Sequence, residues 1–139
     1  MKILISIVSS FLILSFVNNT YAGEKVSPES VKGATTVDAT KAKSLYDTGV
    51  LFVDVRSDKD WAAGRIPKAV HIELKKQFTS ESLAKNAKKS DKIVIYCNGP
   101  SCLRSSQASA KAVEWGYSKV FYFREGLPAW KVAGYSSTK

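Results

Sequence analysis

The chain has 139 residues, with 21 Lys or Arg, 12 Asp or Glu and one His, which give a formal charge of +9 at pH 7. This length accommodates one domain with its own hydrophobic core. Because the chain has only two cysteines and one histidine, a zinc site built from four such ligands is excluded unless carboxylates complete it. A disulfide-dense scaffold is excluded as well. With 45% hydrophobic and 24% charged residues, the composition indicates a folded protein and not a disordered polycation.

The N-terminus has the pattern of a secretory signal peptide. Met1-Lys2 is positively charged, residues 3–17 carry no charge, and a polar stretch then ends in Ala22 before Gly23. The apolar run is shorter than the roughly 20 residues that a transmembrane helix requires. We therefore expect residues 1–22 to be removed, leaving no stable membrane anchor, and the protein to be exported, to a bacterial periplasm or by full secretion. In such an oxidising compartment two thiols can persist as a disulfide.

The remaining chain is expected to comprise a flexible leader at 23–34, one folded domain at 35–136 and a short C-terminal tail at 137–139. The domain begins with a short β-branched strand at 35–37. Asp38 is the expected N-cap of a helix that carries apolar residues on one face and ends at Gly49.

Two continuous apolar runs mark the centre of the predicted sheet. Residues 50–55 and 92–97 have the composition of strands that are buried on both faces of a parallel sheet. The other predicted elements are a strand at 69–72, a helix at 80–88, a helix at 105–115, a strand at 119–123 and a helix at 127–133. Strands that alternate with helices in this way imply an α/β domain with a mainly parallel sheet flanked by helices.

Cys97 is the leading candidate for a catalytic residue. It ends a predicted buried strand, and in parallel sheets the functional site lies beyond the carboxyl ends of the strands. The loop after it enters a helix, whose N-terminal N–H groups and dipole favour an anion or a thiolate. Such a position can lower a cysteine pKa from about 8.5 to between about 3.5 and 7.5. The pattern predicts nucleophilic attack by Cys97 on an anionic substrate.

The loop after Cys97 is the candidate anion-binding segment. Gly99 permits a sharp turn, and Arg104 supplies a forked cation suited to an oxyanion. The candidate binding residues are Asn98, Gly99, Ser101, Cys102, Leu103 and Arg104. Two structural alternatives remain open for Cys97: it is a buried apolar cysteine, or it forms a disulfide with Cys102.

Several separated motifs together resemble the rhodanese-like sulfurtransferase domains. The resemblance covers roughly residues 35–135, nearly the whole chain after the signal peptide. The motifs are Val53-Asp54-Val55-Arg56 with Asp60-Trp61, Gly64-Arg65-Ile66-Pro67-Lys68-Ala69 with His71-Ile72, Tyr96-Cys97 with Arg104-Ser105, and Gly126-Leu127-Pro128-Ala129-Trp130. A single motif of this kind is weak, but the complete set in the family's order is highly specific.

The resemblance implies a three-layer fold, in which helices flank a central five-stranded and mainly parallel sheet. It also implies that the Cys97 thiolate attacks the outer sulfur of a small anionic donor such as thiosulfate and becomes a persulfide. A thiophilic acceptor, cyanide or a thiol, then removes the sulfur. Neither a metal nor an organic cofactor is required, and the resemblance says nothing of the oligomeric state.

The sequence departs from the family pattern around the loop. The arginine that opens the helix usually follows the cysteine by five positions, whereas Arg104 follows Cys97 by seven. Cys102 lies within the lengthened loop, where it is a candidate resolving thiol for a Cys97 persulfide or sulfenic acid. Arg65 stands where the family usually has histidine, and Glu125 stands where glycine often precedes Gly126.

The other polar candidates are interpreted as structural. Asp54 and Arg56 follow a buried strand, where a carboxylate that holds loop amides and a supporting arginine are expected. His71 is the single histidine, and its strand-like position favours a structural or exposed group over a catalytic base. No nucleic-acid partner is expected, because the lysines of one region lack interleaved aromatic residues: Lys75, Lys76, Lys85, Lys88, Lys89 and Lys92.

Two functions besides sulfur transfer are consistent with these residues. One is a thiol redox protein that uses Cys97 and Cys102 as a reversible pair. The other is a non-catalytic domain that binds an anion or a partner's tail in the same loop. Sulfur transfer is the favoured hypothesis because the motif set extends through the whole domain.

Overall fold

The computed structural model describes residues 25–139, so the predicted signal peptide lies outside the described part. No helix within residues 25–139 is long and apolar enough to cross a membrane. The elements in chain order are β1 (Ala34–Thr36), α1 (Ala39–Asp47), β2 (Leu51–Asp54), α2 (Asp58–Ala63), β3 (Val70–His71), α3 (Ser80–Ala84), β4 (Lys92–Tyr96), α4 (Arg104–Glu114), β5 (Lys119–Phe123) and α5 (Gly126–Val132).

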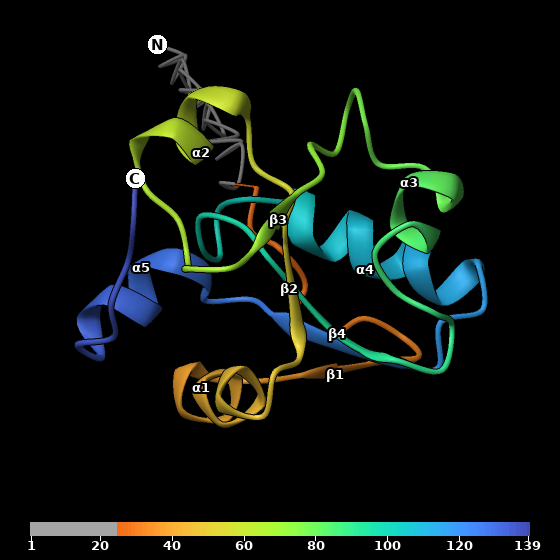
Figure 1. Ribbon diagram of the computed structural model, residues 1–139, viewed down its shortest axis with the longest axis horizontal. Coiled ribbons are helices and arrows are strands. Elements are labelled where there is room, and N and C mark those ends of the chain that lie inside the picture. The colour runs from red at the N-terminus through yellow and green to blue at the C-terminus, as the bar shows by residue number, and fades with distance from the viewer. Residues whose placement is uncertain (1–24) are drawn as a thin grey trace, which may run out of the picture.

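One five-stranded sheet, in the order β1-β5-β4-β2-β3, forms the centre of the fold, and all of its strand pairs are parallel. Helices α1 and α5 cover one face of the sheet, and α3 and α4 cover the other (Figure 1). The predicted α/β fold, with a five-stranded parallel sheet between layers of helices, is confirmed. Because all strands run the same way, the carboxyl ends of β2 and β4 lie at one edge.

The apolar runs in the sequence become β2 and β4 because helices cover both faces of the sheet. Successive side chains of a strand point to opposite faces. Val53 and Ile95 accordingly pack in the core beneath α4, whereas Phe52 and Tyr96 pack beneath α1 and α5. All four side chains are buried, which explains why neither strand alternates apolar with polar residues.

Helix boundaries agree with the capping signals except around α2 and α3. Asp38 caps α1 as predicted, because its carboxylate accepts the Lys41 N–H at 2.8 Å. The sequence interpretation missed α2, which begins where the Ser57 hydroxyl accepts the Asp60 N–H at 3.2 Å. Helix α3 ends at Ala84, earlier than the predicted residue 88, and the chain then passes through a turn.

The segment that was predicted as a flexible leader packs against the domain. The Ser27 N–H donates to Pro100 O at 2.7 Å, and the Arg124 guanidinium donates to Ser27 O at 2.9 Å. The Tyr122 hydroxyl donates to Pro28 O at 2.9 Å, and Val31 is buried. The hydrogen bond to Pro100 O therefore holds this segment against the loop after β4. The segment contributes a backbone group to each of these hydrogen bonds, so its side-chain pattern does not indicate them.

The C-terminal tail is also paired with the domain. The Thr138 N–H donates to Arg65 O at 2.9 Å, and the Arg65 N–H donates to Thr138 O at 2.8 Å. This antiparallel bridge fixes the tail beside the segment between α2 and β3.

Gly126 allows α5 to approach the carboxyl end of β4 very closely. The Leu127 N–H donates to Cys97 O at 3.1 Å. Gly126 itself has a φ of 59°, and a Cβ atom built there would lie 2.1 Å from Cys97 O. That carbonyl belongs to the backbone and has little freedom to move. The site at the end of β4 therefore depends on a glycine at position 126.

We expect Gly126→Ala to lower the free energy of unfolding by about 3 kcal/mol or more. Alanine is unfavourable in the left-handed backbone conformation of this position, and its Cβ would also overlap with Cys97 O. Gly49→Ala is the matched control, since Gly49 has a φ of 82° with nothing within 4 Å of its added Cβ. That control should cost about 1 kcal/mol. Urea unfolding of both variants measures the difference, and equal losses would contradict the importance of the contact with Cys97.

Candidate active site

Cys97 lies directly after β4, with its sulfur facing the N-terminus of α4. The Ser105 N–H donates to Cys97 Sγ at 3.4 Å. The Cys97 thiol is itself within donating distance of two acceptors, Ser105 Oγ at 3.2 Å and Cys102 O at 3.4 Å. Leu103 precedes α4 without capping it through a side chain. The open end of the helix is therefore available to stabilise negative charge on this sulfur. Cys97 itself is 0% exposed.

The loop between β4 and α4 folds back over Cys97. A tight turn closes it, in which the Cys102 N–H donates to Gly99 O at 3.0 Å. Gly99 has a φ of 109°, and an added Cβ would lie 3.4 Å from Glu125 O. Glycine meets both the conformational and the spatial requirement of that position. Of the predicted loop residues, the fold brings Cys102 into hydrogen-bonding contact with the Cys97 sulfur.

Asn98 ties the beginning of the loop to the neighbouring strand and helix. Its Nδ2 donates to the Asp60 carboxylate at 2.9 Å, and its Oδ1 accepts from the Arg56 guanidinium at 3.2 Å. Both partners follow β2, one directly after it and one in α2. The side chain therefore positions the loop and has no hydrogen-bonding group directed at the Cys97 sulfur in this conformation.

Asp54 and Arg56 form a buried ion pair beneath the site. Arg56 Nη2 lies 2.6 Å from Asp54 Oδ2, and Arg56 Nε lies 3.0 Å from Asp54 Oδ1. The same Nη2 donates to Gly64 O at 2.6 Å. The Asp54 carboxylate accepts the Arg56 N–H as well, at 3.0 Å. The pair is nearly inaccessible to water, at 0% and 3% exposure of the two side chains, and it supports the loop through Asn98.

Arg104 is directed away from the loop in this conformation. Its Nη1 is ion-paired with the Glu73 carboxylate and also donates to Val55 O at 3.3 Å. Burial by itself raises the pKa of Glu73, but hydrogen bonds from Arg104 and from the Lys76 N–H outweigh it and hold that pKa below its usual value. The positive charge that was expected to hold a substrate oxyanion is thus already balanced, and Arg104 anchors α4 to the segment after β3.

Cys102 differs from Cys97 in both exposure and charge. Both thiols are free, but Cys102 is half-buried while Cys97 is buried. The hydrogen bond from the Cys97 thiol lowers the pKa of Cys102 to about 6, with further stabilisation from the Asn98 and Arg104 N–H groups. Donation of that hydrogen bond, together with burial, raises the pKa of Cys97. At neutral pH the negative charge of the pair therefore resides on Cys102.

His71 takes no part in the thiol pair. Its ring stacks on Trp61 with the ring centroids 4.8 Å apart, and its Nε2 forms a hydrogen bond with Arg56 O at 2.9 Å. The ring thus supports the backbone beside the Asp54–Arg56 pair, in agreement with the structural interpretation.

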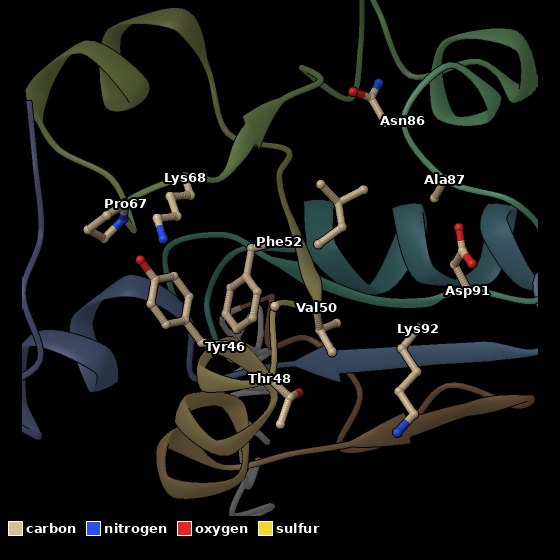
Figure 2. A pocket seen from close by; sticks show the side chains of 12 residues that line it. Tyr46, Thr48, Val50, Phe52, Pro67, Lys68, Asn86, Ala87, Asp91 and Lys92 are labelled. Carbon is tan, nitrogen blue, oxygen red and sulfur yellow. The ribbon is translucent and has the colours of Figure 1, made fainter.

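One cavity of about 360 Å³ opens beside the loop. Its lining residues are Arg56, Asp60, Ala63, Gly64, Asn98, Leu127, Pro128 and Lys131. A larger cavity of about 570 Å³ lies at the amino ends of β2 and β4, where Tyr46, Lys68 and Lys92 border it (Figure 2). That cavity is at the opposite end of the strands from Cys97. Neither cavity is lined by a cysteine.

Three contributors to the site were not identified from the sequence. Ser105 had an available signal, since it is among the first residues of the helix that follows the loop. Neither Glu73 nor Ser27 had a local signal, because Glu73 precedes its partner Arg104 by 31 residues and Ser27 lies far in the sequence from its partner Pro100. Contacts at such separations do not appear in any local pattern.

A family model described as Rhodanese-like domain matches residues 38–133. The chain therefore belongs to the rhodanese-like domain family, whose fold it shares.

Curated and solved relatives agree with this assignment. The chain is 37% identical over 90 residues to a protein named Sulfurtransferase from Allochromatium vinosum, covering 64% of this chain and 79% of that protein. It is 28% identical over 126 residues to Protein HIGH ARSENIC CONTENT 1, mitochondrial, from Arabidopsis thaliana, covering 84% and 73%. A crystal structure of a Bacillus halodurans protein superposes with a TM-score of 0.66 at 25% identity, covering 76% of this chain and 77% of that one.

We expect Asp54→Ala to destabilise the protein by about 3 to 5 kcal/mol, because it leaves the Arg56 charge buried without its partner. Asp47→Ala is the matched control, since it breaks an exposed pair with Lys43 and should cost less than about 1 kcal/mol. Thermal or urea unfolding measures both. Similar losses in the two variants would contradict a supporting role for the buried pair.

We also expect Cys102 to be alkylated far faster than Cys97. Because thiolates react and thiols do not, its rate with iodoacetamide should rise with pH and reach half its maximum at a pH of about 6. Peptide mapping after brief labelling identifies the modified residue. Faster labelling of Cys97, or a midpoint near the ordinary value of about 8.5, would contradict the charge distribution described above.

Proposed function

We propose that this protein is a sulfurtransferase that carries sulfane sulfur as a persulfide on Cys97. The donor is thiosulfate or a related small anion, and the acceptor is cyanide or a thiol. The observation that carries the proposal is the position of Cys97 Sγ at the N-terminus of α4, where it accepts the Ser105 N–H. Family membership and the curated relative named Sulfurtransferase support the same chemistry. The N-terminal sequence pattern supports the further proposal that the protein acts after export, most simply in a bacterial periplasm.

The reaction divides into two balanced displacements. In the first, the S–S bond of thiosulfate breaks, sulfite leaves with the electron pair, and the outer sulfur becomes bonded to the protein. In the second, the acceptor attacks that outer sulfur, and the cysteine leaves as a thiolate. No net oxidation of the protein occurs. The persulfide is anionic at neutral pH, so the Ser105 N–H and the helix dipole would stabilise it where it forms.

A thiol redox function is the second candidate, because both thiols are free and the Cys97 thiol lies 3.4 Å from the carbonyl oxygen of Cys102. Two such neighbouring thiols form a disulfide if the loop moves enough to bring the sulfurs together. Titration of thiols in protein purified without reductant distinguishes this candidate. Two free thiols argue against a functional disulfide, whereas none argues for it.

Intact-protein mass spectrometry tests the sulfurtransferase proposal. After incubation with thiosulfate, the wild type should gain one sulfur atom, located on Cys97 by peptide mapping, and should lose it on addition of cyanide. The double variant Cys97→Ser/Cys102→Ser should gain none, because it lacks both nucleophiles. An unchanged wild-type mass across thiosulfate, thiosulfonates and persulfides would refute the proposal.

A further inference from the structure

The proposed carrier of sulfur is not accessible to a donor in this structure. Cys97 is 0% exposed. Its backbone and loop are held by the Leu127 N–H on Cys97 O and the Ser27 N–H on Pro100 O. Asn98 adds hydrogen bonds to Asp60 and Arg56. A donor that reached Cys97 directly would have to displace a loop that is fixed from three directions.

Cys102 has the access that Cys97 lacks. It lies near the end of the same loop and is half-buried, and its carbonyl oxygen accepts from the Cys97 thiol at 3.4 Å. Its N–H donates to Gly99 O within the closing turn, which holds the residue over Cys97. The closed loop therefore buries Cys97 completely and leaves Cys102 half-buried, so that Cys102 is the more accessible of the two.

We propose that Cys102 is the nucleophile that takes the sulfur atom from the donor, and that it then passes this atom inward to Cys97. The proposal rests on the proposed sulfurtransferase function and assigns its first step to a different residue. It makes the reaction a relay between two thiols within one loop. Cys97 remains the carrier, and the loop remains closed over it.

The relay is balanced without an added oxidant or reductant. The Cys102 thiolate attacks the outer sulfur of thiosulfate, the S–S bond of the donor breaks, and sulfite leaves with the electron pair. Cys97 then attacks the outer sulfur of the Cys102 persulfide, and Cys102 leaves. The Cys97 thiol, which donates to Cys102 O at 3.4 Å, gives up its proton in this step, and the proton passes to the departing Cys102 sulfur. The Cys97 persulfide forms where the Ser105 N–H is available to it.

Single-turnover loading of two matched variants tests the relay. Cys97→Ser and Cys102→Ser differ from the wild type by one sulfur each, and time-resolved intact mass follows the gain of a sulfur atom from thiosulfate. We expect Cys97→Ser to load, with the added sulfur mapped to Cys102. We expect Cys102→Ser to load about 100-fold more slowly than the wild type, since its remaining thiol is covered.

The outcomes separate the relay from the function on which it rests. If Cys102→Ser loads at the wild-type rate and Cys97→Ser does not load, the relay is wrong and direct attack by Cys97 is correct. If the wild type itself does not load with any donor, the sulfurtransferase function is wrong, and the relay with it.

A second measurement covers the case in which a variant does not fold. Wild-type protein that has been alkylated only at Cys102, verified by peptide mapping, retains every native residue of the core. This protein should fail to gain sulfur from thiosulfate while Cys97 remains a free thiol. Loading at an undiminished rate after this modification would overturn the proposal.

Discussion

The buried pair of Asp54 and Arg56 is the interaction on which the site depends. It stands at the carboxyl end of β2, and β2 pairs with β4 in parallel register, so the pair lies beside the strand end that carries Cys97. Its guanidinium also donates to Gly64 O and to Asn98, joining the segment after α2 to the loop. A single desolvated arginine thus fixes three chain segments relative to one another. An unpaired charge on Arg56 at this depth is costly in free energy. Arg56 therefore requires both the Asp54 carboxylate and the Asn98 side chain of the loop as partners.

Close backbone packing, in addition to the ion pair, holds the loop after β4 in place. Gly126 brings α5 against Cys97 O, and Gly99 turns the loop beside Glu125 O. On the opposite side, Arg104 is ion-paired with Glu73, which anchors the start of α4. The loop is consequently held at both ends and at its turn, and its conformation is set by the surrounding fold. This is the physical reason why Cys97 is buried although it lies at the edge of the sheet where substrates bind in such folds.

Much of this arrangement follows from the sequence, but the long-range contacts do not. The apolar runs that became β2 and β4 specify buried parallel strands, and a cysteine after one of them specifies the site. Helix α2 was missed because none of its six residues is buried, so it has no apolar periodicity. The pairing of Glu73 with Arg104 and of Ser27 with Pro100 depends on the three-dimensional course of the chain. The sequence could therefore nominate Arg104 for anion binding, yet it could not reveal that a carboxylate already neutralises it.

The length of the loop accounts for the presence of a half-buried cysteine, Cys102, beside the buried Cys97. Because Arg104 follows Cys97 by seven positions, where the family pattern has five, the chain has room for a closed turn that ends in a cysteine. In this closed loop burial contributes to the raised pKa of Cys97, whereas the pKa of the half-buried Cys102 is lowered, so Cys102 is expected to be the more reactive thiol. A shorter loop would leave a single sulfur to be both accessible and protected. In the proposed relay, separating these two demands between two residues would let a persulfide be loaded at Cys102 and kept away from competing thiols and oxidants at Cys97.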